Sequence, residues 1–252
     1  MVTGRWPRGT ARSISRSLDI YYRDAARTAR MDRLNAQFVG RGSLAFDIGA
    51  HVGDRSASFL RLGARVVAVE PQPAVFRALT LLIGQRSRAT LVRAAVGAEP
   101  GNVALFVNSA NPTVSTVSKA FIAAASGAEA WKNEVWDHSV HTAMITLDQL
   151  ISAHGRPDFI KIDVEGHEHE VLKGLSQPVA ALSFEFTTLQ RQSATAALRR
   201  LMQLGPYRFN ASLGEDHELR FATWVNIDHM IAEVERLPEA ANSGDIYAIL
   251  SE

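Results

Sequence analysis

Hydrophobic and polar positions follow two repeating patterns along the chain: short apolar runs, and longer stretches with apolar residues three or four positions apart. The first pattern is typical of buried strands and the second of helices that cover a core. Strands that alternate with helices indicate a parallel sheet with helices on both faces. The expected strands are residues 44–48, 64–69, 89–96, 103–107, 159–164, 179–186, 207–213 and 245–250. The expected helices are residues 56–62, 73–82, 168–175, 188–204 and 228–237, and residues 145–151 are expected to form a turn into a further short helix.

The N-terminal segment has a different composition. Residues 1–17 are rich in Arg, Ser, Gly and Thr and have little to bury, so we expect a flexible basic tail. An amphipathic helix is expected over residues 18–40, packed over one edge of the core. Tyr21, Tyr22 and Asp24 of this helix could also overhang a ligand site, although their spacing does not require it.

Residues 108–141 interrupt the alternation. A turn-rich run is followed by a stretch with helical character that contains Phe121, Trp131 and Trp136. Insertions of this length between two strands often act as lids or binding loops. We therefore hold two interpretations: a lid that selects the substrate, and a peripheral helix whose tryptophans complete the core.

Length and composition narrow the class of protein. A chain of 252 residues with 46% hydrophobic residues forms one α/β domain, here expected over residues 18–252. The net charge of +1 argues against a nucleic-acid partner, and no stretch approaches the roughly twenty apolar residues of a membrane span. The absence of cysteine excludes disulfides and thiolate chemistry. We expect a cytoplasmic protein.

The stretch of residues 44–54, LAFDIGAHVGD, reads as a strand, a tight turn and a helix start. Gly49 and Gly53 allow the turn, and the free N–H groups of the following helix favour a ligand with acceptor oxygens. Asp47 would repel a pyrophosphate and attract a sulfonium or ammonium group. Glu70 ends the second strand at about the twenty-residue offset where an acid meets a ribose hydroxyl pair.

These two acids favour S-adenosylmethionine as the cofactor. The dinucleotide pattern GxGxxG is absent, which argues against an NAD-dependent oxidoreductase. That oxidoreductase and a non-catalytic S-adenosylmethionine-binding protein are the alternatives. Taken singly, Asp47 could be only a helix cap and Glu70 only a strand-end acid. A nucleic-acid methyltransferase is disfavoured because Asp163-Val164-Glu165-Gly166 stands where amino-directed enzymes have an Asn/Asp-Pro-Pro-aromatic motif.

Three of the four candidate general bases lie at or just after the end of the strand expected over residues 159–164, and the fourth lies near the end of the strand expected over residues 179–186. Side chains alternate along a strand, so Lys161 and Asp163 share one face, and the buried lysine needs a partner among Asp163, Glu165 and Glu185. A base would assist methyl transfer to a hydroxyl. The candidate catalytic set is Asp163, Glu165, His167 and Glu185. Asp163 could instead orient the cofactor amine, and His167 could instead be a capping or surface residue.

The alternation of Asp163, Glu165, His167 and His169 also suggests ligands for a divalent metal ion. However, two histidines two positions apart on a helix point away from each other. We therefore predict no metal site.

Six motifs resemble the FkbM family of S-adenosylmethionine-dependent methyltransferases: FDIGAHVGD, VVAVEP, TLDQL, IKIDVEGHEHEVLKG, SFEF and GDIYAIL. The resemblance implies a class I methyltransferase fold, a Rossmann-like three-layer sandwich whose seven-stranded, mostly parallel sheet has an antiparallel last strand. It also implies methyl transfer, usually to a hydroxyl oxygen. The resemblance further implies that Asp47, Gly49, Gly53 and Glu70 hold the cofactor, and we expect Ala50, His51, Pro71 and Ala95 to belong to the same cofactor-binding set. His51 departs from the general pattern, which often has a glycine there.

Family members differ widely in acceptor, so the resemblance does not name one. We expect a small-molecule or saccharide acceptor. Aromatic residues of the 108–141 insertion could stack on a sugar ring, but they could equally belong to the core. A homodimer is among the assemblies that the sequence allows.

Overall fold

A seven-stranded sheet with the strand order β3-β2-β1-β7-β8-β10-β9 forms the centre of the computed structural model, which describes residues 10–251. Neighbouring strands from β3 to β8 are parallel, whereas β10 runs antiparallel to both β8 and β9. The strands are β1 Leu44–Ile48, β2 Arg65–Val69, β3 Ala89–Val92, β7 Phe159–Ile162, β8 Ala181–Thr187, β9 Tyr207–Leu213 and β10 Ser243–Leu250. The predicted sheet, including its antiparallel last strand, is confirmed.

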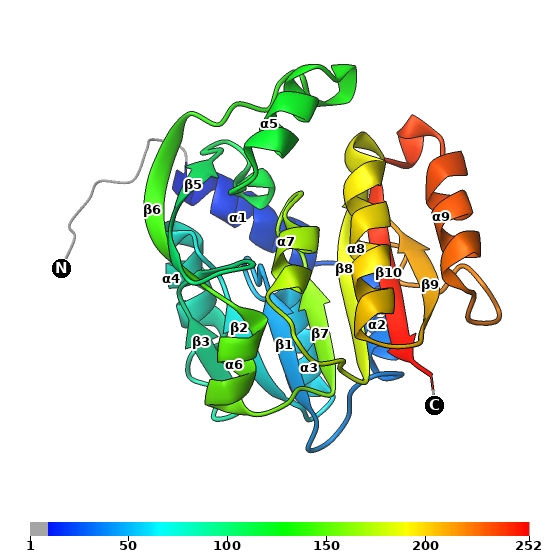
Figure 1. Ribbon diagram of the computed structural model, residues 1–252. Helices are drawn as coiled ribbons and strands as arrows, with labels where there is room; N and C mark the ends of the chain where they lie inside the picture. The colour runs from blue at the N-terminus through cyan, green and yellow to red at the C-terminus, as the bar shows by residue number, and fades with distance from the viewer. Residues whose placement is uncertain (1–9, 252) are drawn as a thin grey trace.

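Helices cover both faces of this sheet (Figure 1). One face carries α2 Ala25–Asn35, α3 Asp54–Arg61 and α4 Pro73–Ile83. The other carries α6 Leu147–His154, α7 Glu168–Lys173, α8 Arg191–Leu204 and α9 Ile227–Arg236. Alternate strand residues supply the two cores: Phe159 packs with the α3 side, and its neighbour Ile160 with the α8 side. Across residues 10–251, no helix is both long enough and apolar enough to cross a membrane.

A second, three-stranded sheet has the order β4-β6-β5, with β4 Ala95–Val96, β5 Gly101–Val107 and β6 His138–Ile145. The single strand predicted over residues 89–96 is wrong, because residues 89–92 pair with β2 and residues 95–96 pair with β6. Strand β6 was not predicted, and its first four residues fall within the expected insertion. It is rich in polar residues and largely exposed or half-buried, so it lacks the apolar run of a buried strand.

The N-terminal segment also differs from the prediction. Helix α1 spans Thr10–Tyr22 and therefore begins inside the expected tail. Helix α2 begins after a break at which Asp24 accepts a hydrogen bond from the backbone N–H of Arg27. Ser13 and Ser17 are buried, and the Ser13 hydroxyl donates to the carbonyl of Ser109 at 2.7 Å. Small polar residues therefore pack α1 against the rest of the protein, although the composition of this segment predicted a flexible tail. Residues 1–9 of that tail lie outside the described part.

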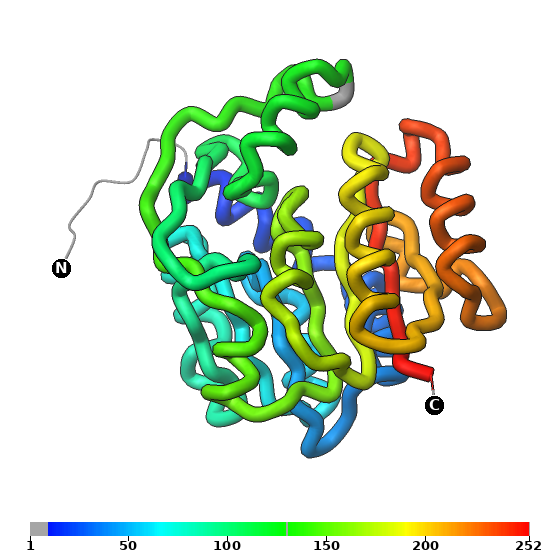
Figure 2. Tube along the Cα trace, in the orientation of Figure 1, coloured from blue at the N-terminus to red at the C-terminus, as the bar shows by residue number. Residues whose placement is uncertain are grey.

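The rest of the predicted insertion contains η1 Pro112–Val114, α5 Lys119–Ser126 and η2 Glu129–Trp131. Figure 2 shows this segment arching over the end of the sheet at which the central parallel strands finish, with α1 running close beneath it. It therefore lies where ligands bind in open parallel sheets.

Candidate active site

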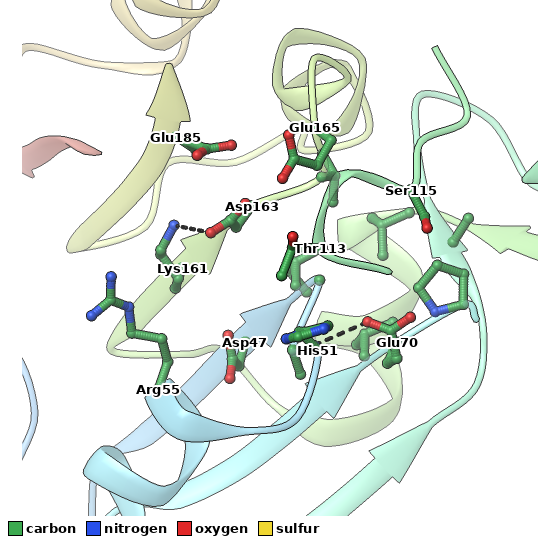
Figure 3. A pocket seen from close by; sticks show the side chains of 18 of the residues that line it. Asp47, His51, Arg55, Glu70, Thr113, Ser115, Lys161, Asp163, Glu165 and Glu185 are labelled. Atoms are coloured by element: carbon green, nitrogen blue, oxygen red, sulfur yellow. Dashed lines mark hydrogen bonds and ion pairs between the residues drawn. The ribbon is translucent and has the colours of Figure 1, made fainter. Parts of the chain in front are cut away.

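A pocket lies at the carboxyl ends of the central strands (Figure 3). Its lining includes Asp47 of β1, Glu70 after β2, Asp163 after β7 and Glu185 of β8. Parallel strands end at the same edge of the sheet, so acids far apart in sequence meet there. The structure thus brings together two acids of the expected cofactor-binding set, Asp47 and Glu70, and two of the candidate catalytic set, Asp163 and Glu185.

The turn after β1 takes a backbone path that favours glycine. Gly49 and Gly53 have φ of +80° and +83°, in the left-handed region. A Cβ atom on Gly49 would lie 1.7 Å from the carbonyl oxygen of Asp163, so the turn packs directly against the loop after β7. Gly49, Ala50, Pro71 and Ala95 line the pocket, whereas Gly53 lies behind it against Leu79.

Asp47 and Glu70 are both buried acids with defined partners. Asp47 accepts a 2.5 Å hydrogen bond from the Ser56 hydroxyl, and burial raises the pKa of Asp47 to about 6. It does not cap α3, whose N-cap position is Gly53. Burial also raises the pKa of Glu70 to about 7, against the effect of backbone N–H groups that donate to it. Both carboxyls therefore become charged near neutral pH.

His51 lies between the two acids in Figure 3. Its backbone has φ of +48°, and its N–H donates to Glu70. The ring packs edge-on against Tyr21 of α1, with 5.9 Å between centroids. Burial lowers the pKa of His51 to about 4, so the ring is neutral at pH 7. Its Nε2 is buried without a hydrogen-bond partner among the described residues, which leaves one polar atom to receive a ligand.

Lys161 is nearly inaccessible to solvent and makes two ion pairs. Its Nζ lies 2.8 Å from Asp245 Oδ1 and 3.1 Å from Asp163 Oδ2. Burial alone would lower the pKa of Lys161, but the two carboxylates raise it above its ordinary value. The predicted partner Asp163 is thus present. The sequence reasoning missed Asp245, whose only signal is its place at the start of the last strand, in GDIYAIL.

Arg55, Asp54 and Glu215 also line the pocket and were not anticipated. Arg55 directly follows the glycine turn, which is the signal that could have found it. Glu215 comes from the loop after β9 and forms an ion pair with Arg27 of α2 at 2.5 Å. Tyr21 lines the pocket from α1, so the suggestion that it overhangs the site holds, whereas Asp24 caps α2.

Asp163, Glu165 and Glu185 form a compact acidic cluster. One oxygen from each lies within 4.8 Å of the others. Glu185 Oε2 is buried without a hydrogen-bond partner in the described part of the chain. Burial and the neighbouring carboxylates raise the pKa of Glu165 and Glu185 well above the ordinary value. Such a cluster can share a proton or hold a divalent cation; the absence of a metal site stays a prediction.

His167 occupies the N-cap position of α7 and is not among the residues that line the pocket. Its Nε2 would lie 3.3 Å from a Cβ atom on Gly97, on the side of the small sheet. The structure therefore separates His167 from the three carboxylates of the candidate set.

The two interpretations of the insertion apply to different parts of it. Trp131 and Trp136 pack edge-on against the buried ring of Phe121, and the Trp136 indole N–H donates to the carbonyl of Val114. These tryptophans complete a local core. Thr113 and Ser115, in contrast, line the pocket.

The fold and the pocket are those of a Rossmann-like class I methyltransferase. The sheet has seven mostly parallel strands with an antiparallel strand between β8 and β9, and acids lie at the ends of β1 and β2. The family model of the methyltransferase FkbM domain matches residues 47–216, more than half of the chain. The protein therefore belongs to the FkbM methyltransferase family and is an S-adenosylmethionine-dependent methyltransferase. This decides against the NAD-dependent oxidoreductase.

The chain is also similar to solved structures of other methyltransferases. Precorrin-6y C5,15-methyltransferase from Geobacter metallireducens has 15% identity and a TM-score of 0.45, and the match covers 88% of this chain and 86% of that one. A TehB-like SAM-dependent methyltransferase from Corynebacterium glutamicum has 11% identity, 94% coverage of each chain and a TM-score of 0.46. An O-methyltransferase from Bacillus cereus, solved with SAH, has 11% identity, 100% and 94% coverage and a TM-score of 0.45. No curated protein sequence matches the chain significantly.

The pocket residues fit S-adenosylmethionine, the cofactor of the family. Glu70 has acceptor capacity for a ribose hydroxyl pair beyond the two N–H groups that it already accepts. The partnerless Nε2 of His51 offers a further hydrogen bond, and the surrounding carboxylates favour a cation.

Proposed function

We propose that this enzyme methylates a hydroxyl oxygen of a small-molecule or saccharide acceptor. The observation that supports the proposal is the cluster of Asp163, Glu165 and Glu185, which lines the pocket. Burial and the neighbouring carboxylates raise the pKa of Glu165 and of Glu185 above the ordinary value. A hydroxyl is too weak an acid to ionise near neutral pH, so a base within hydrogen-bond reach assists its attack. A carboxylate whose pKa is raised binds a proton more strongly, and is therefore a stronger base, than an ordinary one.

Residues on the β2 side of the pocket hold the cofactor in this proposal. Glu70 accepts hydrogen bonds from the ribose hydroxyls, and Pro71 and Ala95 provide apolar surface for the adenine. Asp47 contributes negative potential beneath the turn. When bound, S-adenosylmethionine supplies a methyl group on a positively charged sulfur, which is already activated for displacement. The protein has to align the acceptor and accept its proton.

We assign proton acceptance to the pair Glu165 and Glu185. As the acceptor oxygen forms its bond to the methyl carbon, its proton passes to one of these carboxylates and then to solvent. Bound S-adenosylmethionine would balance the step, because its sulfur would keep the electron pair of the broken bond to the methyl carbon. His167 has no place in this step because it lies outside the pocket lining. Asp163, which is paired with Lys161, is the weaker candidate for the base.

Thr113 and Ser115 of the insertion are suited to bind a hydroxylated acceptor, since their side chains both donate and accept hydrogen bonds. The acids in the pocket disfavour acceptors with phosphate or carboxylate groups next to the reacting hydroxyl. A neutral polyol or sugar fits both conditions.

Labelled methyl transfer tests the proposal. The protein is incubated with methyl-labelled S-adenosylmethionine and fractionated extract of its host, and the labelled product is identified by mass spectrometry and NMR. We expect an O-methyl product; an N- or C-methylated product would contradict the proposal. With that acceptor, Glu185→Gln is expected to lower kcat about 10²- to 10⁴-fold. The exposed Glu235→Gln serves as the matched control.

A further inference from the structure

One end of the pocket contains paired charges of both signs. Figure 3 shows Arg55, Lys161 and Asp163 grouped on one side of His51, with Glu70 on the other. Asp245, from β10, is buried beside this group and is not among the residues that line the pocket. A ligand that reaches from Glu70 to this end meets an arginine and an aspartate together.

Asp245 connects the two cations. Its Oδ1 lies 2.8 Å from Lys161 Nζ, and its Oδ2 lies 3.6 Å from Arg55 Nη2. Lys161 in turn contacts Oδ2 of Asp163 at 3.1 Å. Within residues 10–251, Oδ1 of Asp163 has no such contact and remains for a ligand.

Arg55 retains donors for an anion. Its carboxylate neighbours in the described chain, Asp245 and Glu215, stay at 3.6 and 3.8 Å, beyond hydrogen-bond distance. Glu215 is engaged by Arg27 instead, at 2.5 and 2.9 Å. Arg55 Nη1 contacts the buried ring of His217, which keeps the guanidinium in place. A guanidinium that is fixed in this way, with Nη2 not hydrogen-bonded, is suited to bind a carboxylate.

We propose that Arg55 binds the carboxylate and Asp163 the ammonium of the amino-acid end of S-adenosylmethionine. Asp245 is then a positioning residue, which acts on Arg55 directly and on Asp163 through Lys161. An α-amino acid carries one charge of each sign two bonds apart, and this end of the pocket offers the complementary pair. A ligand without the amino-acid group has no carboxylate for Arg55 to bind. The assignment concerns the cofactor and holds for any acceptor.

Two ligands that differ in the amino-acid group test the proposal by isothermal titration calorimetry. S-adenosylhomocysteine carries it, and 5′-methylthioadenosine lacks it. We expect Arg55→Gln to raise the Kd of S-adenosylhomocysteine about 10- to 100-fold and to change the Kd of 5′-methylthioadenosine by no more than about twofold. Arg55→Lys should restore part of the lost affinity. The exposed Arg86→Gln is the matched control. Retained affinity for S-adenosylhomocysteine, or equal loss for both ligands, would overturn the proposal.

The wild-type protein provides a test that does not depend on the folding of a variant. S-adenosylhomocysteine without its carboxylate should bind about 10- to 100-fold more weakly than the intact ligand, and in Arg55→Gln the two should bind equally. Equal binding of both ligands to the wild type would refute the role of Arg55. Asp245→Asn should raise the Kd of S-adenosylhomocysteine about 3- to 10-fold without changing that of 5′-methylthioadenosine. An unchanged affinity for S-adenosylhomocysteine would refute the positioning role. No acceptor is used, so failure here leaves the O-methylation proposal standing.

Discussion

The backbone N–H of His51 donates a 3.0 Å hydrogen bond to Oε2 of Glu70, nineteen positions later in the chain. This bond joins the turn after β1 to the end of β2. It also helps to hold His51 at φ of +48°, a conformation that costs a non-glycine residue about 1 kcal/mol or more. The acid that we propose to bind the ribose therefore also shapes the turn that is expected to hold the cofactor.

Replacement of Glu70 by glutamine should weaken the cofactor complex. The amide keeps one acceptor oxygen but loses the charge, and hydrogen bonds to charged groups contribute about 1.5–3 kcal/mol. We expect the Kd of S-adenosylhomocysteine to rise about 10- to 100-fold by calorimetry. The exposed Glu99→Gln should leave it unchanged. Equal affinities of the two variants would remove Glu70 from the binding set.

Cofactor affinity should depend on pH through the same residue. The raised pKa of about 7 means that Glu70 is charged above neutrality and protonated below it. Only the charged form accepts hydrogen bonds with both oxygens, so affinity is complete above pH 7 and falls as the pH drops from 7 toward 5. Titrations of S-adenosylhomocysteine at pH 8, 7, 6 and 5 measure this. In Glu70→Gln this part of the pH dependence should disappear.

Gly49→Ala should be strongly destabilising. The added Cβ would lie 1.7 Å from the carbonyl oxygen of Asp163, and φ is +80°. Strain and overpacking together predict a loss of about 3 kcal/mol or more in the free energy of unfolding. Gly101→Ala is the control, because a Cβ atom there meets nothing within 4 Å, and a change within about 1 kcal/mol is expected. Urea unfolding of the two variants measures this difference. Equal midpoints for Gly49→Ala and Gly101→Ala would contradict the prediction.

Glu215 should stabilise the fold in a pH-dependent manner. Partial burial alone would raise its pKa, but His217, Arg55 and Arg27 hold the pKa well below the ordinary value. Its stabilisation is therefore present above the unfolded-state pKa of about 4.3 and is lost as the pH falls below it. Since the side chain is half exposed, we expect Glu215→Gln to lower the free energy of unfolding by only about 1–2 kcal/mol at pH 7.

Urea unfolding at pH 7 and at pH 3.5 measures the effect, which should shrink at the lower pH. The exposed Glu218→Gln, three positions along the same loop, is the control and should unfold like the wild type at both values. A loss that is independent of pH would show that Glu215 acts by packing alone.

Much of the architecture was predictable because strand and helix periodicities are local. The apolar run before Gly49 and the acid at the end of β2 placed Asp47 and Glu70 at one edge of a parallel sheet, where the structure has them. Side-chain alternation likewise placed Lys161 and Asp163 on one face, and they form an ion pair. Strand β6 was missed because its polar sequence does not carry the pattern of a buried strand.

What only the tertiary structure decided is which distant charges meet. Asp245 reaches Lys161 because β10 inserts antiparallel between β8 and β9. Glu215 forms an ion pair with Arg27, which is far from it in the sequence. His167, adjacent in sequence to the catalytic candidates, is turned away at the start of α7. The sequence by itself determined the strands, the turn and the acids at their ends, because these depend on neighbouring residues. Strand order and loop packing determined the partners of those acids, because ion pairs depend on distances through space.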